Sequence, residues 1–98
     1  MQIVGDEQLA REVMAFLQEW DNAIARLDIQ DIVQLCRPEI RLVDVSMEVK
    51  GVEAYQALWQ QYRHFMPEGI RIERQDLNIH VTSDLAVVDG CVRVSYAV

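Results

Sequence analysis

The chain has 98 residues, of which 51% are hydrophobic and 26% charged, and its formal net charge is −7. This length fits a single domain over residues 1–98, and the apolar share is large enough to bury a core, which excludes a disordered chain. Residues 1–49 hold ten acidic side chains against four basic ones. Such a surface repels phosphate groups, so neither nucleic acid nor an anionic membrane is expected as a partner.

The cysteines and the N-terminus point to a cytoplasmic protein. The first residues lack the basic and apolar segments of a secretion signal, and no apolar run approaches the roughly 20 residues that span a bilayer. Cys36 and Cys91 lie far apart and form no CxxC motif, which favours reduced core thiols over a disulfide or a metal site. Because the sequence also lacks the common zinc, nucleotide and serine-hydrolase motifs, we expect no metal and no cofactor.

Two helices are expected in the first forty residues. Apolar side chains recur at spacings of three and four from Leu9 to Leu27, and Asp6 stands where an N-cap would help this helix begin. A second, short helix is predicted to begin at Asp28 with a capping arrangement. It ends before Pro38, because the residue that precedes a proline is pushed out of the helical region. The two helices therefore follow one another with almost no linker.

The next segment combines a hairpin with a third helix. From Ile40 the apolar period changes to two, as in a short strand, and Gly51 closes what we interpret as a hairpin. Aromatic side chains then recur at helical spacing and predict a helix over residues 52–66, which Pro67 breaks.

Two longer strands complete the predicted order. The first covers residues 70–81, and its alternation slips at residues 74–76, which predicts a β-bulge or a sharp bend. The second covers residues 86–98, so the sequence ends inside it, at Val98. The order of elements is ααββαββ, and the fold class is α+β.

At this point the residues resemble the NTF2-like superfamily, in particular its SnoaL-like and ketosteroid-isomerase-like branch. The match rests on FLQEWDNAI at residues 16–24, IRLVD at residues 40–44, GVEAY at residues 51–55 and the later Trp59. The resemblance implies a cone in which a long N-terminal helix and two further helices pack on a curved, mostly antiparallel sheet. It also implies a pocket in that cone for small molecules.

The resemblance has two consequences at the C-terminus. Members of the family usually carry two further strands after the position of Val98, so we expect a domain that is incomplete at its C-terminus. Unpaired strand edges promote association, and we therefore expect another copy to complete the sheet, most simply in a homodimer. A monomer with a well-dispersed folded spectrum would contradict this expectation.

The family's catalytic groups are carried over residue by residue. Asp44 matches the position of the carboxylate that shuttles a proton, which makes it the candidate general base. Trp20 stands where the family places a tyrosine donor, and the strand of the second donor would lie beyond Val98. The alternative for Asp44 is a strand-end carboxylate that meets solvent or pairs with an arginine. His80 is a weaker candidate for proton transfer.

An aromatic stripe supplies the candidate pocket wall. Its side chains could orient a ligand through their rings and polar tips, or they could simply form the core. The pocket-lining candidates are Phe16, Trp20, Leu42, Tyr55, Trp59 and Tyr62.

Two functions of different classes follow. The first is the binding of a small apolar or aromatic molecule, with cyclase, isomerase or lyase chemistry through Asp44 as its catalytic form. The second is a non-catalytic NTF2-like module for oligomerisation. The sequence leaves open whether the protein is an enzyme.

Overall fold

The computed structural model describes residues 1–44 and 46–96. Val45 and Val98, which fall within the predicted strand segments, lie outside the described residues. The described residues form eight helices and strands, in the order β1 (Gln2–Val4), α1 (Glu7–Arg26), α2 (Ile29–Gln34), β2 (Arg41–Val43), β3 (Glu48–Lys50), α3 (Val52–Phe65), β4 (Arg71–Val81) and β5 (Ala86–Ser95). Seven of these match the predicted order, and β1 is an addition.

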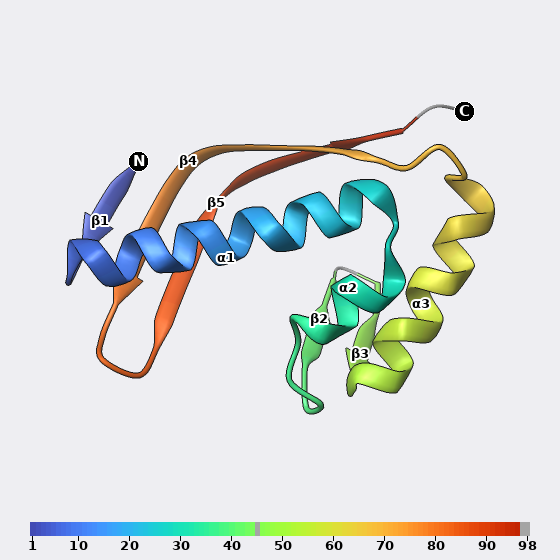
Figure 1. Ribbon diagram of the computed structural model, residues 1–98, viewed down its shortest axis with the longest axis horizontal. Coiled ribbons are helices and arrows are strands. Elements are labelled where there is room, and N and C mark those ends of the chain that lie inside the picture. Colours follow the sequence, from blue (N-terminus) through green and yellow to red (C-terminus); the bar gives the residue numbers. More distant parts are fainter. Residues whose placement is uncertain (45, 97–98) are drawn as a thin grey trace.

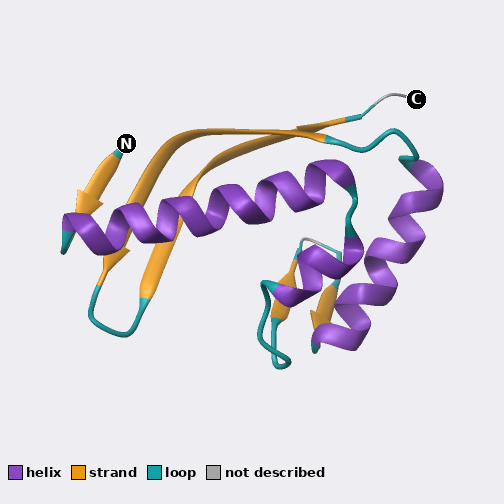
Figure 2. Ribbon diagram, viewed as in Figure 1, coloured by secondary structure: helices purple, strands orange, loops and turns teal. Residues whose placement is uncertain are grey.

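The long helix α1 organises the molecule. Strands β4 and β5 form a long, bent ribbon that follows α1 along its length, with β1 at the N-terminal end of the helix (Figure 1). The other elements, α2, α3 and the β2–β3 hairpin, gather at the opposite end of α1 (Figure 2). The N-terminal strand and the second group of elements therefore lie at opposite ends of α1.

The strands form two separate sheets among the described residues. One has the order β1-β4-β5 and the other is the antiparallel hairpin β2-β3. β4 and β5 are antiparallel, with Ile79 opposite Val88. β1 pairs in parallel with β4, placing Ile3 opposite Ile79. Three residues are too few to show a strand period, which is why the sequence pattern did not reveal β1.

The predicted helix starts are confirmed. The Asp6 carboxylate accepts a hydrogen bond of 2.9 Å from the backbone N–H of Leu9 and caps α1. The Asp28 carboxylate accepts one of 3.2 Å from Asp31 and caps α2. Between the two helices the chain turns at Leu27, whose φ of 52° ends α1. Each cap satisfies an N–H group that has no partner within its helix.

The predicted bulge is also confirmed. The register of β4 against β5 shifts between Gln75 and Asn78, and Asp76 adopts a left-handed φ of 56°. Gly90 lies opposite this irregularity, where an added Cβ would meet the Leu77 side chain at 2.8 Å. The shift moves the inward side from even to odd positions of β4, so that both Arg74 and Ile79 reach the side covered by α1.

The main core joins the three helices at the C-terminal end of α1. Its buried members are Ala23, Ile24, Leu27, Ile29, Ile32, Tyr55, Trp59 and Met66. A polar contact closes the same corner, since the Arg63 guanidinium donates a hydrogen bond of 2.6 Å to the backbone oxygen of Leu27. The core therefore fixes α2 and α3 against one end of α1 and leaves the N-terminal half of the helix free to line a groove.

Candidate functional site

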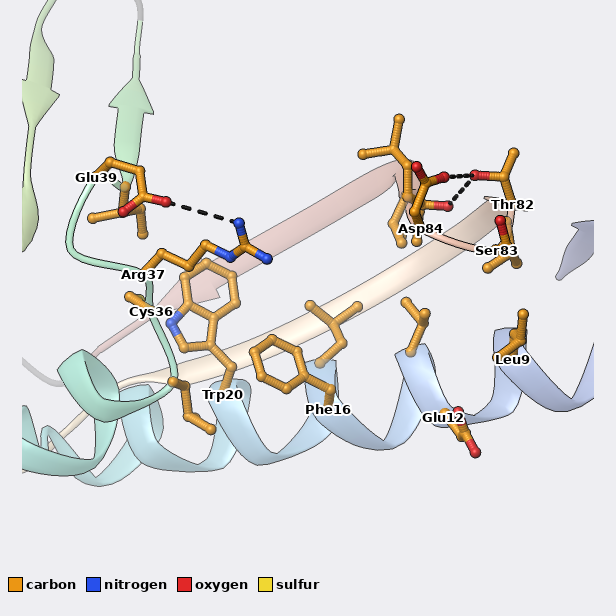
Figure 3. Close-up of a pocket in the computed structure, with 18 residues that line it drawn as sticks. Leu9, Glu12, Phe16, Trp20, Cys36, Arg37, Glu39, Thr82, Ser83 and Asp84 are labelled. Carbon is orange, nitrogen blue, oxygen red and sulfur yellow. Dashed lines mark hydrogen bonds and ion pairs between the residues drawn. The ribbon is translucent and has the colours of Figure 1, made fainter.

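A groove of about 1020 Å³ opens along α1. Helix α1 forms its floor, the segment after α2 closes one end, and the β4–β5 turn closes the other (Figure 3). Its lining residues are Leu9, Glu12, Val13, Phe16, Leu17, Trp20, Leu35, Cys36, Arg37, Glu39, Ile40, Val81, Thr82, Ser83, Asp84, Leu85, Ala86 and Val88. Most of this lining is apolar, as in binding sites for small molecules.

The helical period explains why α1 presents this lining. Val13, Phe16, Leu17 and Trp20 recur at spacings of three and four, so they share one face of the helix. Phe16 and Trp20 project side by side from α1 into the groove, whereas the Glu12 carboxylate points away from it (Figure 3). Phe16 keeps 48% of its surface exposed. The groove therefore offers an aromatic wall that the chain itself does not cover.

Polar groups stand at the two ends of the groove. At one end Arg37 and Glu39 form an ion pair at 3.8 Å, with side chains that are 88% and 70% exposed. At the other end the Thr82 hydroxyl contacts the Asp84 carboxylate at 3.1 Å and donates to the backbone oxygen of Leu85 at 3.2 Å (Figure 3). The site can therefore hold an apolar body between two polar ends.

The indole of Trp20 contacts a charged side chain of β4. The Arg74 guanidinium lies 6.0 Å from the centre of its ring, within reach of a cation–π contact. Two hydrogen bonds of 2.7 Å to the Asp21 carboxylate fix that guanidinium. The same hydrogen bonds raise the pKa of Arg74, which outweighs the opposing effect of burial. The Asp21–Arg74 pair therefore helps to fix the orientation of the Trp20 indole that lines the groove.

Trp20 also connects the groove to the core. The indole nitrogens of Trp20 and Trp59 are both buried without a hydrogen-bond partner among residues 1–44 and 46–96. They lie near Tyr55, whose side chain is 1% exposed. Burial raises the pKa of the Tyr55 phenol, and the neighbouring indole N–H groups oppose that shift without reaching regular hydrogen-bond geometry. Burial likewise raises the pKa of the Cys36 thiol, which donates to the Ile32 carbonyl at 3.4 Å.

The predicted pocket residues divide into two groups. Phe16 and Trp20 line the groove. The other four belong to the main core, where Tyr55 and Trp59 are buried and Leu42 and Tyr62 pack against them. The rings of Trp59 and Tyr62 meet edge to face, with their centres 5.6 Å apart. An aromatic stripe has the same helical spacing whether it packs or lines a pocket, so the sequence alone could not separate the two groups.

The two predicted proton carriers stand away from the groove. Asp44 is exposed in the turn between β2 and β3, where its backbone N–H donates to the Met47 carbonyl at 2.9 Å. His80 is exposed on β4, opposite Val87. Neither side chain lines the groove. Over the part of the chain that the structure describes, no three His, Cys, Asp or Glu side chains gather as a metal site would require.

Several groove residues gave no signal in the sequence. The sequence predicted only a connection between two strands at Thr82 to Leu85, and only the end of a helix at Arg37. Leu85 remains 65% exposed, although it is a large apolar residue. An apolar residue directly after a polar turn is a weak hint of a binding surface, and only the bend of the β4–β5 ribbon brings it to α1.

Comparison with known proteins settles the family. A family model of the SnoaL-like domain matches residues 13–97. This chain is a SnoaL-like domain. The predicted membership in the NTF2-like superfamily is therefore confirmed, and so is the α+β fold.

A solved structure shows the same architecture. The crystal structure of an NTF2-like protein of unknown function from Pseudomonas putida KT2440 is similar to the SnoaL-like domain with a TM-score of 0.79. The two share 23% identity, and the match covers 94% of this chain and 67% of the other. The comparison with curated proteins finds no match. Within the described part of the domain, no helix is both long and apolar enough to cross a membrane.

Proposed function

We propose that this SnoaL-like domain binds a small apolar or aromatic molecule in the groove along α1. The observation that carries the proposal is an apolar groove of about 1020 Å³ whose wall includes the exposed side chains of Phe16 and Leu85. Concave, mostly apolar sites near this size accommodate drug-sized ligands. Binding becomes more favourable when a ligand displaces water from exposed apolar surface of this kind.

The lining suggests the chemistry of the ligand. Phe16 and Trp20 offer ring surfaces, on which a flat apolar molecule can pack. Arg37 and Glu39 at one end, and Thr82 at the other, can meet a carbonyl or hydroxyl substituent. Aromatic ketones and phenols combine these features. The free thiols of Cys36 and Cys91 agree with the cytoplasmic location that the proposal retains.

Acid–base catalysis by Asp44 remains the finer form of this proposal. Its support is the family resemblance, since the Asp44 side chain is exposed and does not line the groove. Ligand binding therefore stands without it. His80, which is exposed on β4, has no role in the binding proposal.

The test is a thermal-shift screen with a panel of aromatic ketones and phenols. A ligand that binds only the folded state increases the free energy of unfolding by RT ln(1 + [L]/Kd), and the melting temperature rises as a result. We expect at least one class of the panel to raise it in a concentration-dependent way. If no compound produces a shift, and none perturbs the indole fluorescence of the domain, the binding proposal is wrong.

A second candidate function is self-association, which one observation favours. Strand β5 is exposed along most of its length, and Val87, Val92, Val94 and Tyr96 each leave more than half of their surface exposed. Surface of this kind on an edge strand promotes pairing with another chain. Light scattering over a range of concentrations tests it, with a dimer as the expected species.

A further inference from the structure

The charged side chains that line the groove are unevenly balanced. Among the lining residues that the structure describes, Arg37 is the one basic side chain, and it stands against the acidic Glu12, Glu39 and Asp84. Arg37 is paired with Glu39 at 3.8 Å. The Glu12 carboxylate points away from the groove (Figure 3). Asp84 is therefore the acidic lining residue whose surroundings decide which ligand charge the groove favours.

The Asp84 carboxylate stands at the end of the groove that the β4–β5 turn closes (Figure 3). The Thr82 hydroxyl lies 3.1 Å from one of its oxygens. No ion pair within residues 1–44 and 46–96 involves Asp84. Because an ionised carboxylate accepts several hydrogen bonds through its two oxygens, Asp84 keeps the capacity to bind a charged donor.

The first turn of α1 lies at the same end of the groove, where Leu9 belongs to the lining. A helix N-terminus carries a partial positive charge, which by itself would repel a cation. Here the Asp6 carboxylate caps the helix through the backbone N–H of Leu9 and brings a full negative charge to this turn. The net charge of the chain is −7, so the field of the whole protein also attracts cations.

We propose that the groove prefers a ligand with a protonated amine, whose ammonium group lies at Asp84 and whose apolar body packs against Phe16 and Trp20. The inference rests on the proposed binding function of the groove and adds the charge of the ligand to it. A carboxylate of the same shape would place a like charge beside Asp84, and an alcohol would gain no ion pair there.

Helix α1 sets the length of such a ligand. Asp84 stands near the Leu9 end of the groove, and Phe16 lies further along the helix toward Trp20 (Figure 3). Seven residues separate Leu9 from Phe16, which corresponds to about 10 Å along the helix axis. A ring at Phe16 and an ammonium group at Asp84 therefore need a flexible spacer between them. A naphthalene ring on a hexyl chain that ends in an amine has a suitable length.

The test compares three probes that share this naphthalene ring and hexyl chain. The chain ends in an amine, an alcohol or a carboxylic acid, and isothermal titration calorimetry at neutral pH and low salt measures each Kd. We expect the amine to bind about fivefold more tightly than the alcohol, as an exposed ion pair allows, and the acid to bind more weakly than the alcohol. The advantage of the amine should shrink at high salt, because salt screens exposed charges.

Variants at Asp84 assign this preference to one side chain. Asp84→Asn removes the charge and keeps the shape, so the ratio of the amine and alcohol affinities should fall to about one. Asp84→Lys should reverse the order, so that the acid binds more tightly than the amine, and misfolding cannot produce such a gain. Asp89→Asn is the matched control. Asp89 lies on the opposite face of the ribbon beside Asn78, and its variant should keep the original ratio.

The outcomes separate this inference from the binding function of the groove. Equal affinities of the amine and the alcohol, or an equal loss of preference in Asp84→Asn and Asp89→Asn, would overturn the ammonium site. The groove would still stand if Phe16→Ser weakened the binding of both probes. If none of the three probes binds while an aromatic ketone or phenol does, the ammonium site alone is wrong. If no compound of either kind binds, both proposals are wrong.

Discussion

The Asp21 carboxylate in α1 accepts two hydrogen bonds of 2.7 Å from the Arg74 guanidinium in β4. The pair is largely shielded, with side-chain exposures of 19% and 23%. It joins the helix to the sheet just before the β-bulge, and it places the guanidinium beside Trp20 at the groove. A single polar contact therefore couples the fold to the candidate binding wall.

Loss of this pair should destabilise the domain. Arg74→Gln keeps much of the side-chain length but leaves the Asp21 carboxylate without its charged donor, so we expect the free energy of unfolding to fall by about 2 kcal/mol. Urea unfolding measures the change. As a control, Arg11→Gln breaks the Arg11–Glu7 pair, whose side chains are 70% and 69% exposed, and should cost less than about 0.5 kcal/mol. Equal losses in the two variants would contradict the structural role of Arg74.

The groove proposal predicts different outcomes for two exposed phenylalanines. Phe16 lines the groove, whereas Phe65 is 74% exposed at the end of α3 and does not. Phe16→Ser should abolish most of the thermal shift that a bound ligand produces, because it removes a ring from the wall. Phe65→Ser should leave the shift unchanged. The binding site lies elsewhere if the two variants respond alike.

Asp44 allows binding to be separated from catalysis. Because its side chain is exposed outside the groove, Asp44→Asn should change the Kd of a groove ligand by less than about twofold, within the range of a surface substitution. If a substrate is identified, the same variant tests the general base. Undiminished turnover would exclude that role, and a large change in ligand affinity would contradict the position assigned to the site.

Stability should fall at alkaline pH. Burial raises the pKa values of Tyr55 and Cys36 above their ordinary values of 10.0 and 9.0. The unfolded chain therefore loses these protons first as the pH rises, and the free energy of unfolding decreases from about pH 9 upward. Tyr55→Phe should make this decrease shallower in urea titrations between pH 7 and 11.

The Tyr55→Phe comparison contains its own control. The difference between the two proteins at pH 7 reports the packing of the hydroxyl group, and only the change of that difference with pH reports ionisation. A constant difference over the whole range would show that Tyr55 ionises equally in the folded and unfolded states.

Alanine substitutions at two glycines distinguish the cost of backbone strain from the cost of a steric overlap. Gly51 and Gly69 have φ values of 88° and 87°, which side chains rarely adopt. A Cβ at Gly51 would meet only the Pro38 oxygen at 3.7 Å, whereas one at Gly69 would overlap the Ala25 backbone oxygen. Gly51→Ala should cost about 1–3 kcal/mol through φ alone, and Gly69→Ala should cost more. The midpoints of urea unfolding rank the two variants, and the reverse order would contradict the contact at Ala25.

The sequence predicted the elements of this fold because the signals are local. Leu9 to Leu27 repeat at helical spacing, Asp6 and Asp28 stand at helix starts, and the alternation slips where β4 has its bulge. Each signal is contained within a few residues of the chain. Family membership followed from the order of these elements together with motifs such as residues 16–24. The sequence pattern did not predict the short strand β1, because three residues are too few to show a strand period.

Only the tertiary structure decided which of these residues share a site. Phe16 and Tyr55 both belong to aromatic helical stripes, yet one is exposed along the groove and the other is enclosed in the core. Leu85 reaches the same groove from a distant turn because the β4–β5 ribbon bends along α1. Hydrophobic periodicity tells which side of a helix or strand is apolar, but contacts between distant segments determine whether that side is covered. The sequence by itself therefore established the family and its elements, and the packing of those elements established an open, apolar groove.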